Sequence, residues 1–377
     1  MQRISWWGHC KSGLSRWALV GAVAAGFTFS GCATPVYLAK LGWGQAGIIL
    51  HTKPKDAVLD DPAVDPSVKE KIGLVLEAKA YGEEKIGLAE TSNFLGFYQV
   101  QGPCLLYVVS ACPKDRLESH HWWFPITGKV TTKGFFRHDD ALREKRKLEG
   151  KGLDVFVQGA QAYSTLGWFK DPVFSTMLAQ DRAVLVNVVI HELTHATVFF
   201  KDQLDFNEQI AHFVGCQGAV DFSGVRFGPG SPDQERAEGI MDDGILFARF
   251  MRSVCRRLSD LYTQPLPLTF KLEERENIFR EVKQEFERLR EQFRTDFYLG
   301  FEDVRLNNAV ILAMARYVAN IEQIQKIYEA LEKDLRKTVA FFKQLEKENV
   351  SDPEGYLSTW LGERCSGEGG SRHHDEE

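Results

Sequence analysis

Residues 184–195 read VLVNVVIHELTH, an apolar run that ends in two histidines four positions apart with a glutamate directly after the first. On a helix, residues four apart are separated by about 40° of rotation, so both imidazoles project from one face and can share one ion. Burying such polar groups without partners costs free energy, and binding zinc through neutral imidazole removes that cost. The pattern therefore predicts a helix over residues 181–201 with one zinc ion held by His191 and His195.

Glu208 is the predicted third zinc ligand. Residues 201–206 (KDQLDF) are long enough to reverse the chain before a second helical pattern over residues 207–220, which would lay Glu208 beside the first helix. The alternative is an acid near a helix N-terminus, where the helix dipole favours it. His212 follows one turn later on the same face, either as a group that supports the ligands or as a competing ligand.

Glu192 is the predicted catalytic base. It lies about 100° around the helix from His191, where it can reach a metal-bound water without being a ligand. Zinc lowers the pKa of its water towards about 7 and polarises the scissile carbonyl, and Glu192 takes the proton and delivers it to the leaving amine. Tyr163 and Tyr317 are candidate oxyanion donors; the alternative for each is a packed core tyrosine.

The rest of the chain predicts an α+β fold: a zincin-like core, made of a small mixed sheet and the HELTH helix, and a largely helical C-terminal region. Three short apolar runs are predicted to be strands of one sheet, and a charged segment is predicted to be a helix between two of these strands. The segment GAQAYSTLGWF is predicted to be the edge strand beside the cleft, where an extended peptide could pair with it. Those strands are residues 105–109, 122–126 and 154–157, the helix 141–149, and the edge 159–169. Further helices are expected over residues 37–50, 67–90 and beyond Pro232, with a break at Pro265 and Pro267.

Two amphipathic patterns occupy the helical region, at residues 272–293 and 324–345. They suit an antiparallel hairpin, a coiled-coil partner face, or two helices packed onto their own domain. The predicted divisions are a signal peptide (1–31), an N-terminal α/β part (32–180), a zinc-binding helical part (181–265), a helical C-terminal region (266–350) and a polar tail (351–377).

The N-terminus resembles an export signal. Arg3, Lys11 and Arg16 precede an apolar run at residues 18–30, which is too short to cross a bilayer, and FSGC at residues 29–32 resembles a lipobox. A plain signal peptide or an uncleaved anchor are the alternatives. We expect an exported lipoprotein that faces the bacterial periplasm and is anchored in the membrane by lipid on Cys32.

Composition excludes some partners. The 377 residues are 44% hydrophobic, enough for a real core, and the formal net charge of −6 without a basic stripe argues against nucleic acid. Cysteine spacing matches no metal framework. Cys104 and Cys112 flank a predicted strand of about 26 Å, too long for a disulfide, so buried free thiols are expected.

Four separated motifs carry a family resemblance. They are WWFPITGKV (122–130) with GFF (134–136), AYSTLGWFKDPV (162–173), HELTHATVF (191–199) and FNEQIAHFVG (206–215). Together they resemble the bacterial putative aminopeptidase family, a group of lipoprotein-like zinc metallopeptidases, from about residue 32 to about residue 345.

The resemblance implies a gluzincin-type site, with His191, His195 and Glu208 as ligands and Glu192 as catalyst. The stretch NNA at 307–309, followed by Tyr317, also looks like a family feature and favours Tyr317 over Tyr163. Two departures are His212, where a small or hydroxyl residue is expected, and Phe29, where a lipobox usually has leucine.

The expected function is hydrolysis of peptide bonds by a zinc aminopeptidase. The word aminopeptidase rests on the family name, because the sequence identifies no acid that would hold a substrate's free amine. The alternatives are a metalloendopeptidase or an amidase of cell-wall peptides, and a non-catalytic scaffold lipoprotein with structural zinc.

Overall fold

The computed structural model describes residues 33–124, 128–162 and 170–367, and the chain divides into two compact units, Met1–His51 and Thr52–Glu377. In the first unit the described part is one helix, α2 (Ala33–His51). This agrees with the helix expected over residues 37–50. The second unit holds all other described elements, and the domain boundaries expected at residues 181, 266 and 351 stay predictions.

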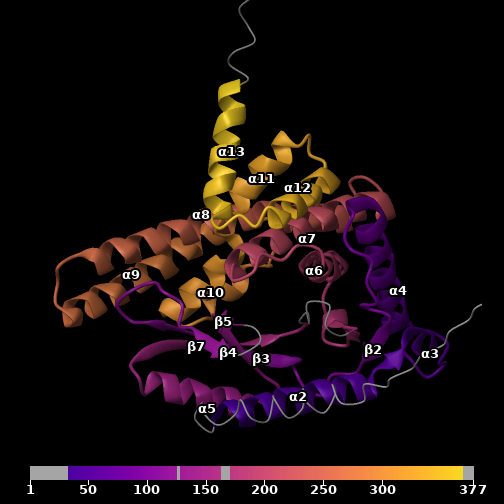
Figure 1. Ribbon diagram of the computed structural model, residues 1–377, viewed down its shortest axis with the longest axis horizontal. Coiled ribbons are helices and arrows are strands. Elements are labelled where there is room, and N and C mark those ends of the chain that lie inside the picture. Colours follow the sequence, from indigo (N-terminus) through magenta and orange to yellow (C-terminus); the bar gives the residue numbers. More distant parts are fainter. Residues whose placement is uncertain (1–32, 125–127, 163–169, 368–377) are drawn as a thin grey trace, which may run out of the picture. The chain divides into compact units, whose positions relative to one another are not determined.

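The second unit is α+β, as predicted, with its strands in three small sheets (Figure 1). The sheet orders are β1-β2-β8, β6-β3-β7 and β4-β5; in the first, β1 and β2 are antiparallel while β2 and β8 are parallel. The strands are β1 (Lys53–Pro54), β2 (Gly96–Tyr98), β3 (Leu106–Pro113), β4 (Trp122–Phe124), β5 (Gly128–Val130), β6 (Thr132–Phe135), β7 (Leu153–Ala160) and β8 (Val173–Phe174).

The expectation of one sheet is wrong at residues 122–124. β3 pairs with β6 along one edge and with β7 along the other, so no edge of β3 is left for β4. β4 instead forms a hairpin with β5, and Trp123 on it is 63% exposed. Apolar composition made this segment look like part of the core sheet, although the aromatic side chains lie partly at the surface.

The β6-β3-β7 sheet lies between helices α5 and α10 (Figure 1). Helix α5 (His138–Glu149) is the predicted charged helix; it has two aspartates in its first turn and buries Ala141 and Leu148. Helix α10 (Asn308–Val318) packs on β3 and β7 and also on the helices beyond them. Helix α10 thereby connects the sheet to the helical part of the unit.

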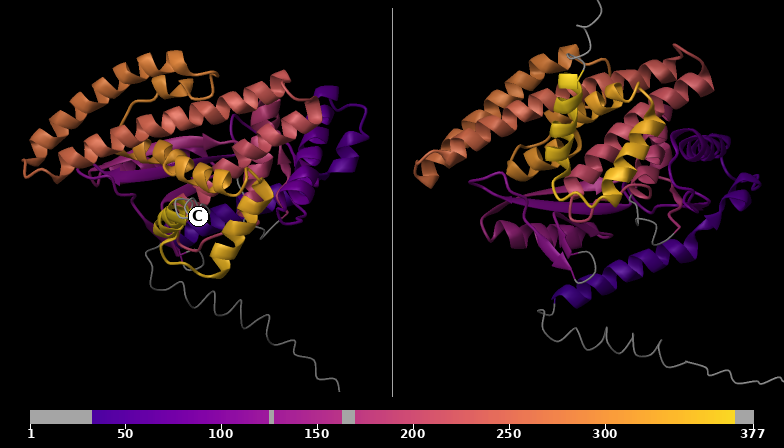
Figure 2. Two further views of the ribbon diagram at one scale, coloured as in Figure 1. Left: turned by 90° about the horizontal axis from the view of Figure 1, so that it is seen from above. Right: turned by 45° about the horizontal axis from the view of Figure 1, so that its top comes forward.

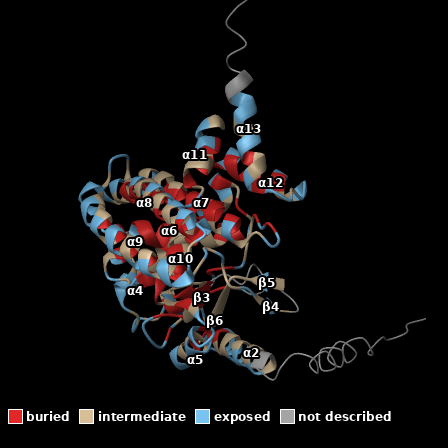
Figure 3. Cartoon of the chain, turned by 90° about the vertical axis from the view of Figure 1, so that its left-hand side faces the viewer, coloured by how far each residue is buried: buried red, intermediate tan, exposed pale blue. Residues whose placement is uncertain are grey.

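Helices α6 (Arg182–His195) and α7 (Leu204–Phe227) form the centre of the unit and are largely buried (Figure 3). Around them lie α4 (Pro66–Tyr81), the π-helical turn η2 (Gly82–Ile86) and α8 (Pro232–Thr263). The short elements α3 (Lys55–Leu59) and η3 (Met177–Ala179) complete the N-terminal half.

The predicted break at Pro265 and Pro267 separates α8 from α9 (Leu268–Leu289), and the two helices lie side by side (Figure 2). Phe279, Val282 and Phe286 of α9 are buried. Phe286 packs against Phe247 of α8 and Phe301, with ring centroids 6.3 and 4.8 Å away. The first amphipathic pattern therefore packs onto its own domain. Short 3-10 turns follow it, η4 (Arg290–Gln292) and η5 (Leu299–Glu302).

The prediction of one continuous helix over the second amphipathic pattern is wrong. The pattern forms α11 (Ile321–Ala330) and α12 (Leu335–Lys347), because Glu332 and Lys333 take left-handed backbone angles and Asp334 caps α12 by accepting from the Lys337 N–H. The apolar faces of both helices are buried. Helix α13 (Pro353–Gly367) follows, inside the region predicted as a polar tail.

Four cysteines are free in the described chain, and three of them, Cys104, Cys112 and Cys216, are buried, as expected. Burial raises the pKa of the Cys112 thiol to about 12, so it is an unreactive thiol at neutral pH. Among the helices described here, none is both long and apolar enough to cross a membrane. Cys32 lies outside the described residues.

Candidate metal centre

Helix α6 carries the first two candidate ligands at its C-terminal end. Its start is fixed by Asp181, whose carboxylate accepts from the Val184 N–H at 2.9 Å and also from Arg236 of α8. The helix then buries Leu185, Val189 and Ile190 completely. The apolar lead-in therefore serves as a buried support that holds the following histidines in place.

The helix ends at His195, six residues before the end that its pattern predicted. The amide side chain of Asn207 accepts from the Phe200 N–H and donates to the Phe200 carbonyl, each at 2.8 Å. These two bonds close a loop over residues 200–207, and Asp202 inside it takes a left-handed backbone. The loop satisfies the Phe200 backbone groups outside a helix and brings the start of α7 back to the end of α6.

Two glycines let α7 pack very closely on α6. A Cβ at Gly215 would lie 2.5 Å from Asn187 Oδ1 and 3.2 Å from the Cβ of His191, and one at Gly218 would lie 2.9 Å from Ile190 Cδ1. Such distances are below van der Waals contact, so only glycine allows this approach. The interhelical spacing that places Glu208 is thus set by residues in the middle of α7.

Three side chains converge where these helices meet: His191, His195 and Glu208. The two histidine Nε2 atoms are 3.1 Å apart, His191 Nε2 is 3.6 Å from Glu208 Oε2, and His195 Nε2 is 3.5 Å from Glu208 Oε1. Tetrahedral zinc with bonds of about 2.0–2.1 Å sets its ligand atoms roughly 3.3–3.4 Å apart. The observed separations fit that geometry, and the set of two imidazoles and one carboxylate suits the ion.

Strong electrostatic coupling joins these groups. Burial raises the pKa of Glu208, but the two histidines beside it lower it more, and the net shift is downward. Burial lowers the pKa of His195, but Glu208 raises it more, and the net shift is upward. The carboxylate is therefore held in its charged form, which is the form that binds a cation.

Glu192 lies beside the three donors without being one of them. Its Oε2 atom is shielded from solvent and has no hydrogen-bond partner among the described residues. Burial raises the pKa of Glu192, the two histidines oppose that shift, and Glu208 and Asp171 add to it. A buried, unpaired carboxylate oxygen with a raised pKa has the properties of a group that takes up and releases a proton.

His212 and Tyr317 lie next to each other and close to the donors. Burial, and after it the Glu208 charge, raises the pKa of Tyr317. His212 is buried on α7, its Nε2 lies 3.9 Å from Cys216 Sγ, and its ring centroid is 6.3 Å from that of Tyr317 on α10. Burial, with a smaller contribution from His191, lowers the pKa of His212 to about 4, so the imidazole is neutral at pH 7. His212 is absent from the three-donor cluster, and Tyr163 lies outside the described residues.

Comparison with known proteins gives one match. The model of the family described as "Putative aminopeptidase" matches residues 36–355. The chain belongs to this family. Comparisons with curated proteins and with solved structures gave no match. The family region includes every element that supplies a donor, and the family description indicates peptidase activity.

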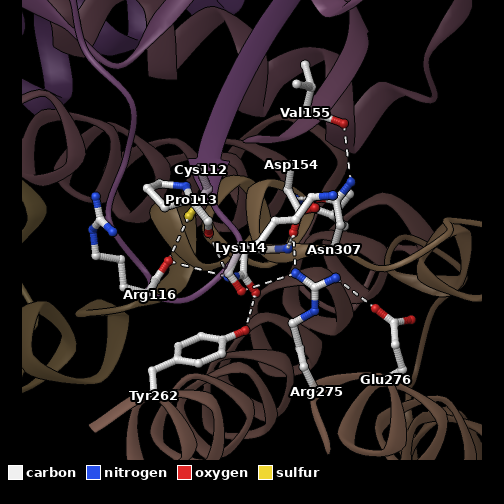
Figure 4. Close-up of polar contacts among 12 residues, drawn as sticks. Cys112, Pro113, Lys114, Arg116, Asp154, Val155, Tyr262, Arg275, Glu276 and Asn307 are labelled. Carbon is white, nitrogen blue, oxygen red and sulfur yellow. Dashed lines mark hydrogen bonds and ion pairs between the residues drawn. The ribbon is translucent and has the colours of Figure 1, made fainter. Parts of the chain in front are cut away.

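Within the family region, a buried polar network holds the N-terminal end of α10 (Figure 4). The Asp154 carboxylate of β7 accepts from Arg275 Nη1 at 2.9 Å and from the Asn308 N–H at 3.0 Å. The Asn308 side chain accepts from the Tyr262 hydroxyl at 2.7 Å and donates to the Pro113 carbonyl. We call this the Asp154 network; it fixes α10 against the sheet, α8 and α9.

The C-terminal end of α10 is fixed separately, next to Tyr317. The Arg316 guanidinium is almost fully buried and donates from Nε to Asp205 of α7 at 2.6 Å and from Nη2 to Thr131 at 3.2 Å. Sequence reasoning missed Arg316, Asn207 and Gly215. The available signals were an arginine directly before a candidate tyrosine, an asparagine before Glu208, and glycines at 215 and 218 of a buried helix.

Strand β7 is an edge strand of the β6-β3-β7 sheet, so part of the predicted edge at residues 159–169 lies on it. Val155 turns its carbonyl outward and accepts from the Asn307 side chain. The backbone N–H and C=O groups of Val157 and Gly159 face the same side as the Val155 carbonyl, away from β3. Within the described part of the chain nothing hydrogen bonds with these outward groups. That stretch of edge has the hydrogen-bonding groups that an extended peptide requires. Residues 163–169 lie outside the described chain.

Proposed function

We propose that this member of the aminopeptidase family is a zinc metallopeptidase with a gluzincin-type site in a zincin-like core. The observation that carries the proposal is the convergence of His191, His195 and Glu208 at separations suited to one zinc ion, with the unpaired Glu192 carboxylate beside them. A structural zinc site is usually closed by four protein ligands, whereas a catalytic one has three and leaves a position open. Three donors favour catalysis over a scaffold.

The chain's own residues have distinct tasks in this mechanism. His191, His195 and Glu208 hold the ion, and zinc, when bound, acidifies a water molecule and polarises the substrate carbonyl. Glu192 accepts the proton of the attacking water on a carboxylate oxygen and delivers it to the leaving amine. The Tyr317 hydroxyl donates to the oxygen of the carbonyl as charge develops there, and the neutral His212 adds no competing charge.

The replacement Glu192→Gln tests this assignment. It keeps size and removes the basic oxygen, so we expect kcat on a hydrolysed peptide to fall by about 10²–10⁴-fold while zinc remains bound one per chain. Glu291→Gln, at an exposed position, is the matched control and should leave both quantities unchanged. A Glu192→Gln variant that hydrolyses peptides at the normal rate would exclude Glu192 as the base.

Trimming from the amino terminus is the finer proposal, and it rests on the family description. A peptide series offered with a free and with an acetylated amino terminus distinguishes the two kinds of peptidase. We expect kcat/KM to fall at least tenfold on acetylation. Equal cleavage of both forms would identify an endopeptidase or an amidase of cell-wall peptides instead.

Export and lipid attachment at Cys32 are a separate proposal, supported by the charge and apolar pattern of residues 1–32. Growth with a clickable palmitate analogue should label the protein in bacterial membranes, and Cys32→Ser should abolish the label. Persistent labelling of the Cys32→Ser variant would place the lipid elsewhere.

A further inference from the structure

Helix α2 presents an apolar face to solvent. Val36, Trp43 and Leu50 are 56%, 84% and 79% exposed. At 100° per residue these three side chains fall within about 40° of one another around the helix axis. Ala39 and Ala46, both exposed, lie on the same face, which we call the Trp43 face. Figure 3 shows exposed and half-buried positions along α2. A continuous exposed stripe of this kind marks an interaction surface.

The charge around this face is of one sign. The first acidic residue of the chain is Asp56, whereas Lys40 borders the Trp43 face and Lys53 and Lys55 follow the helix. After the predicted signal peptide, residues 32–55 contain three basic residues (Lys40, Lys53 and Lys55) and no acidic residue, whereas residues 56–377, with 40 basic and 52 acidic residues, carry a formal net charge of −12. The N-terminal segment is therefore selectively suited to an anionic surface.

The size of the face argues against a protein partner. Stable protein interfaces use about 20–30 residues a side, and the Trp43 face is one stripe of a single 19-residue helix. An exposed tryptophan among apolar side chains is typical of positions at a membrane–water interface, and the neighbouring Lys40 can keep its charged head in the headgroup layer.

We propose that the Trp43 face of α2 docks on the surface of a phospholipid bilayer, with the helix lying in the plane of the headgroups. The contact does not depend on the catalytic assignment, and it differs from a lipid chain on Cys32 because specific side chains of a folded helix enter the interface. This docking would hold helix α2 parallel to the membrane surface. A flexible lipid chain on Cys32 alone would leave the helix free to rotate.

Photo-crosslinking in the full chain tests the proposal. The probe p-benzoylphenylalanine replaces Trp43, or Gln45 as the matched control, and the protein is reconstituted into vesicles of phosphatidylethanolamine and phosphatidylglycerol. The two positions are equally close to any N-terminal anchor but lie about 160° apart around the helix. A third probe at Val225, 74% exposed on α7, controls for exposure.

We expect lipid adducts at position 43 to exceed those at positions 45 and 225 at least fivefold, and to decrease in vesicles of phosphatidylcholine alone. Equal lipid labelling at positions 43 and 45 would show tethering without a docked face and would overturn the proposal. Adducts of position 43 with protein in place of lipid would overturn it as well. Because Trp43 and Val225 are exposed, probes there leave the core intact, and their comparison stands even if the Gln45 variant folds poorly.

Discussion

Two polar clusters in the second unit differ in the partners of their carboxylates. In the Asp154 network the carboxylate faces the Arg275 guanidinium and the Asn308 side chain has partners on both its oxygen and its nitrogen, while the Arg275 Nε has no partner among the described residues. In the metal centre two imidazole nitrogens and a carboxylate point at one another, and the Glu192 oxygen beside them has no partner. In the first cluster a fixed positive charge faces the carboxylate, whereas in the second the carboxylates lie beside imidazoles, whose nitrogens can also bind a cation. The comparison indicates that the first cluster supports the fold and that the second has the donor atoms a cation would need.

The largest expected effect on stability comes from Asp154→Asn. It leaves the buried Arg275 guanidinium facing a neutral amide, and breaking a buried ion pair in this way costs about 3–5 kcal/mol of unfolding free energy. Urea denaturation measures the loss, and zinc per folded chain should stay unchanged. Asp260→Asn, an exposed acid on α8, is the control. Loss of zinc at unchanged stability would show that the two clusters are not separate.

Tyr317→Phe affects the chemistry and leaves the fold in place. Removing one oxyanion donor lowers kcat by about 10²-fold, which corresponds to about 2.7 kcal/mol. Steady-state kinetics should show the change in kcat with KM nearly constant. Tyr328→Phe, a buried tyrosine on α11, should leave kcat as it is. An unaltered kcat in Tyr317→Phe would remove this tyrosine from the mechanism.

Gly215→Ala tests how the packing of α7 on α6 sets the donor geometry. The new methyl group would meet Asn187 at 2.5 Å, so the helices must separate, at a cost of about 1–3 kcal/mol. Zinc affinity, measured by competition with a chelating dye, should fall with it. Gly73→Ala on α4 has open space and should be neutral or stabilising by up to about 1 kcal/mol. Unchanged zinc affinity in Gly215→Ala would mean that this spacing does not place Glu208.

The sequence predicted those features that depend on local periodicity. The helix carrying His191 and His195, the helix carrying Glu208 and the break between α8 and α9 follow from apolar spacing and from proline. Features that depend on distant partners were wrong or missed. The end of α6 is set by the Asn207 amide, β4 pairs with β5 outside the core sheet, and α11 is separated from α12 by two left-handed residues. Apolar periodicity does not predict these contacts, because each depends on which partner a backbone or side-chain group finds in the folded chain.

The central claim is that His191, His195 and Glu208 hold one zinc ion, and elemental analysis of the purified full chain tests it most directly. We predict one zinc per chain in the wild type and in Asp154→Asn, and less than a tenth of that in His195→Ala with the helical circular-dichroism signal retained. A wild-type protein that carries no zinc and cannot be reconstituted with it, or a His195→Ala variant that keeps a full equivalent, would contradict the account.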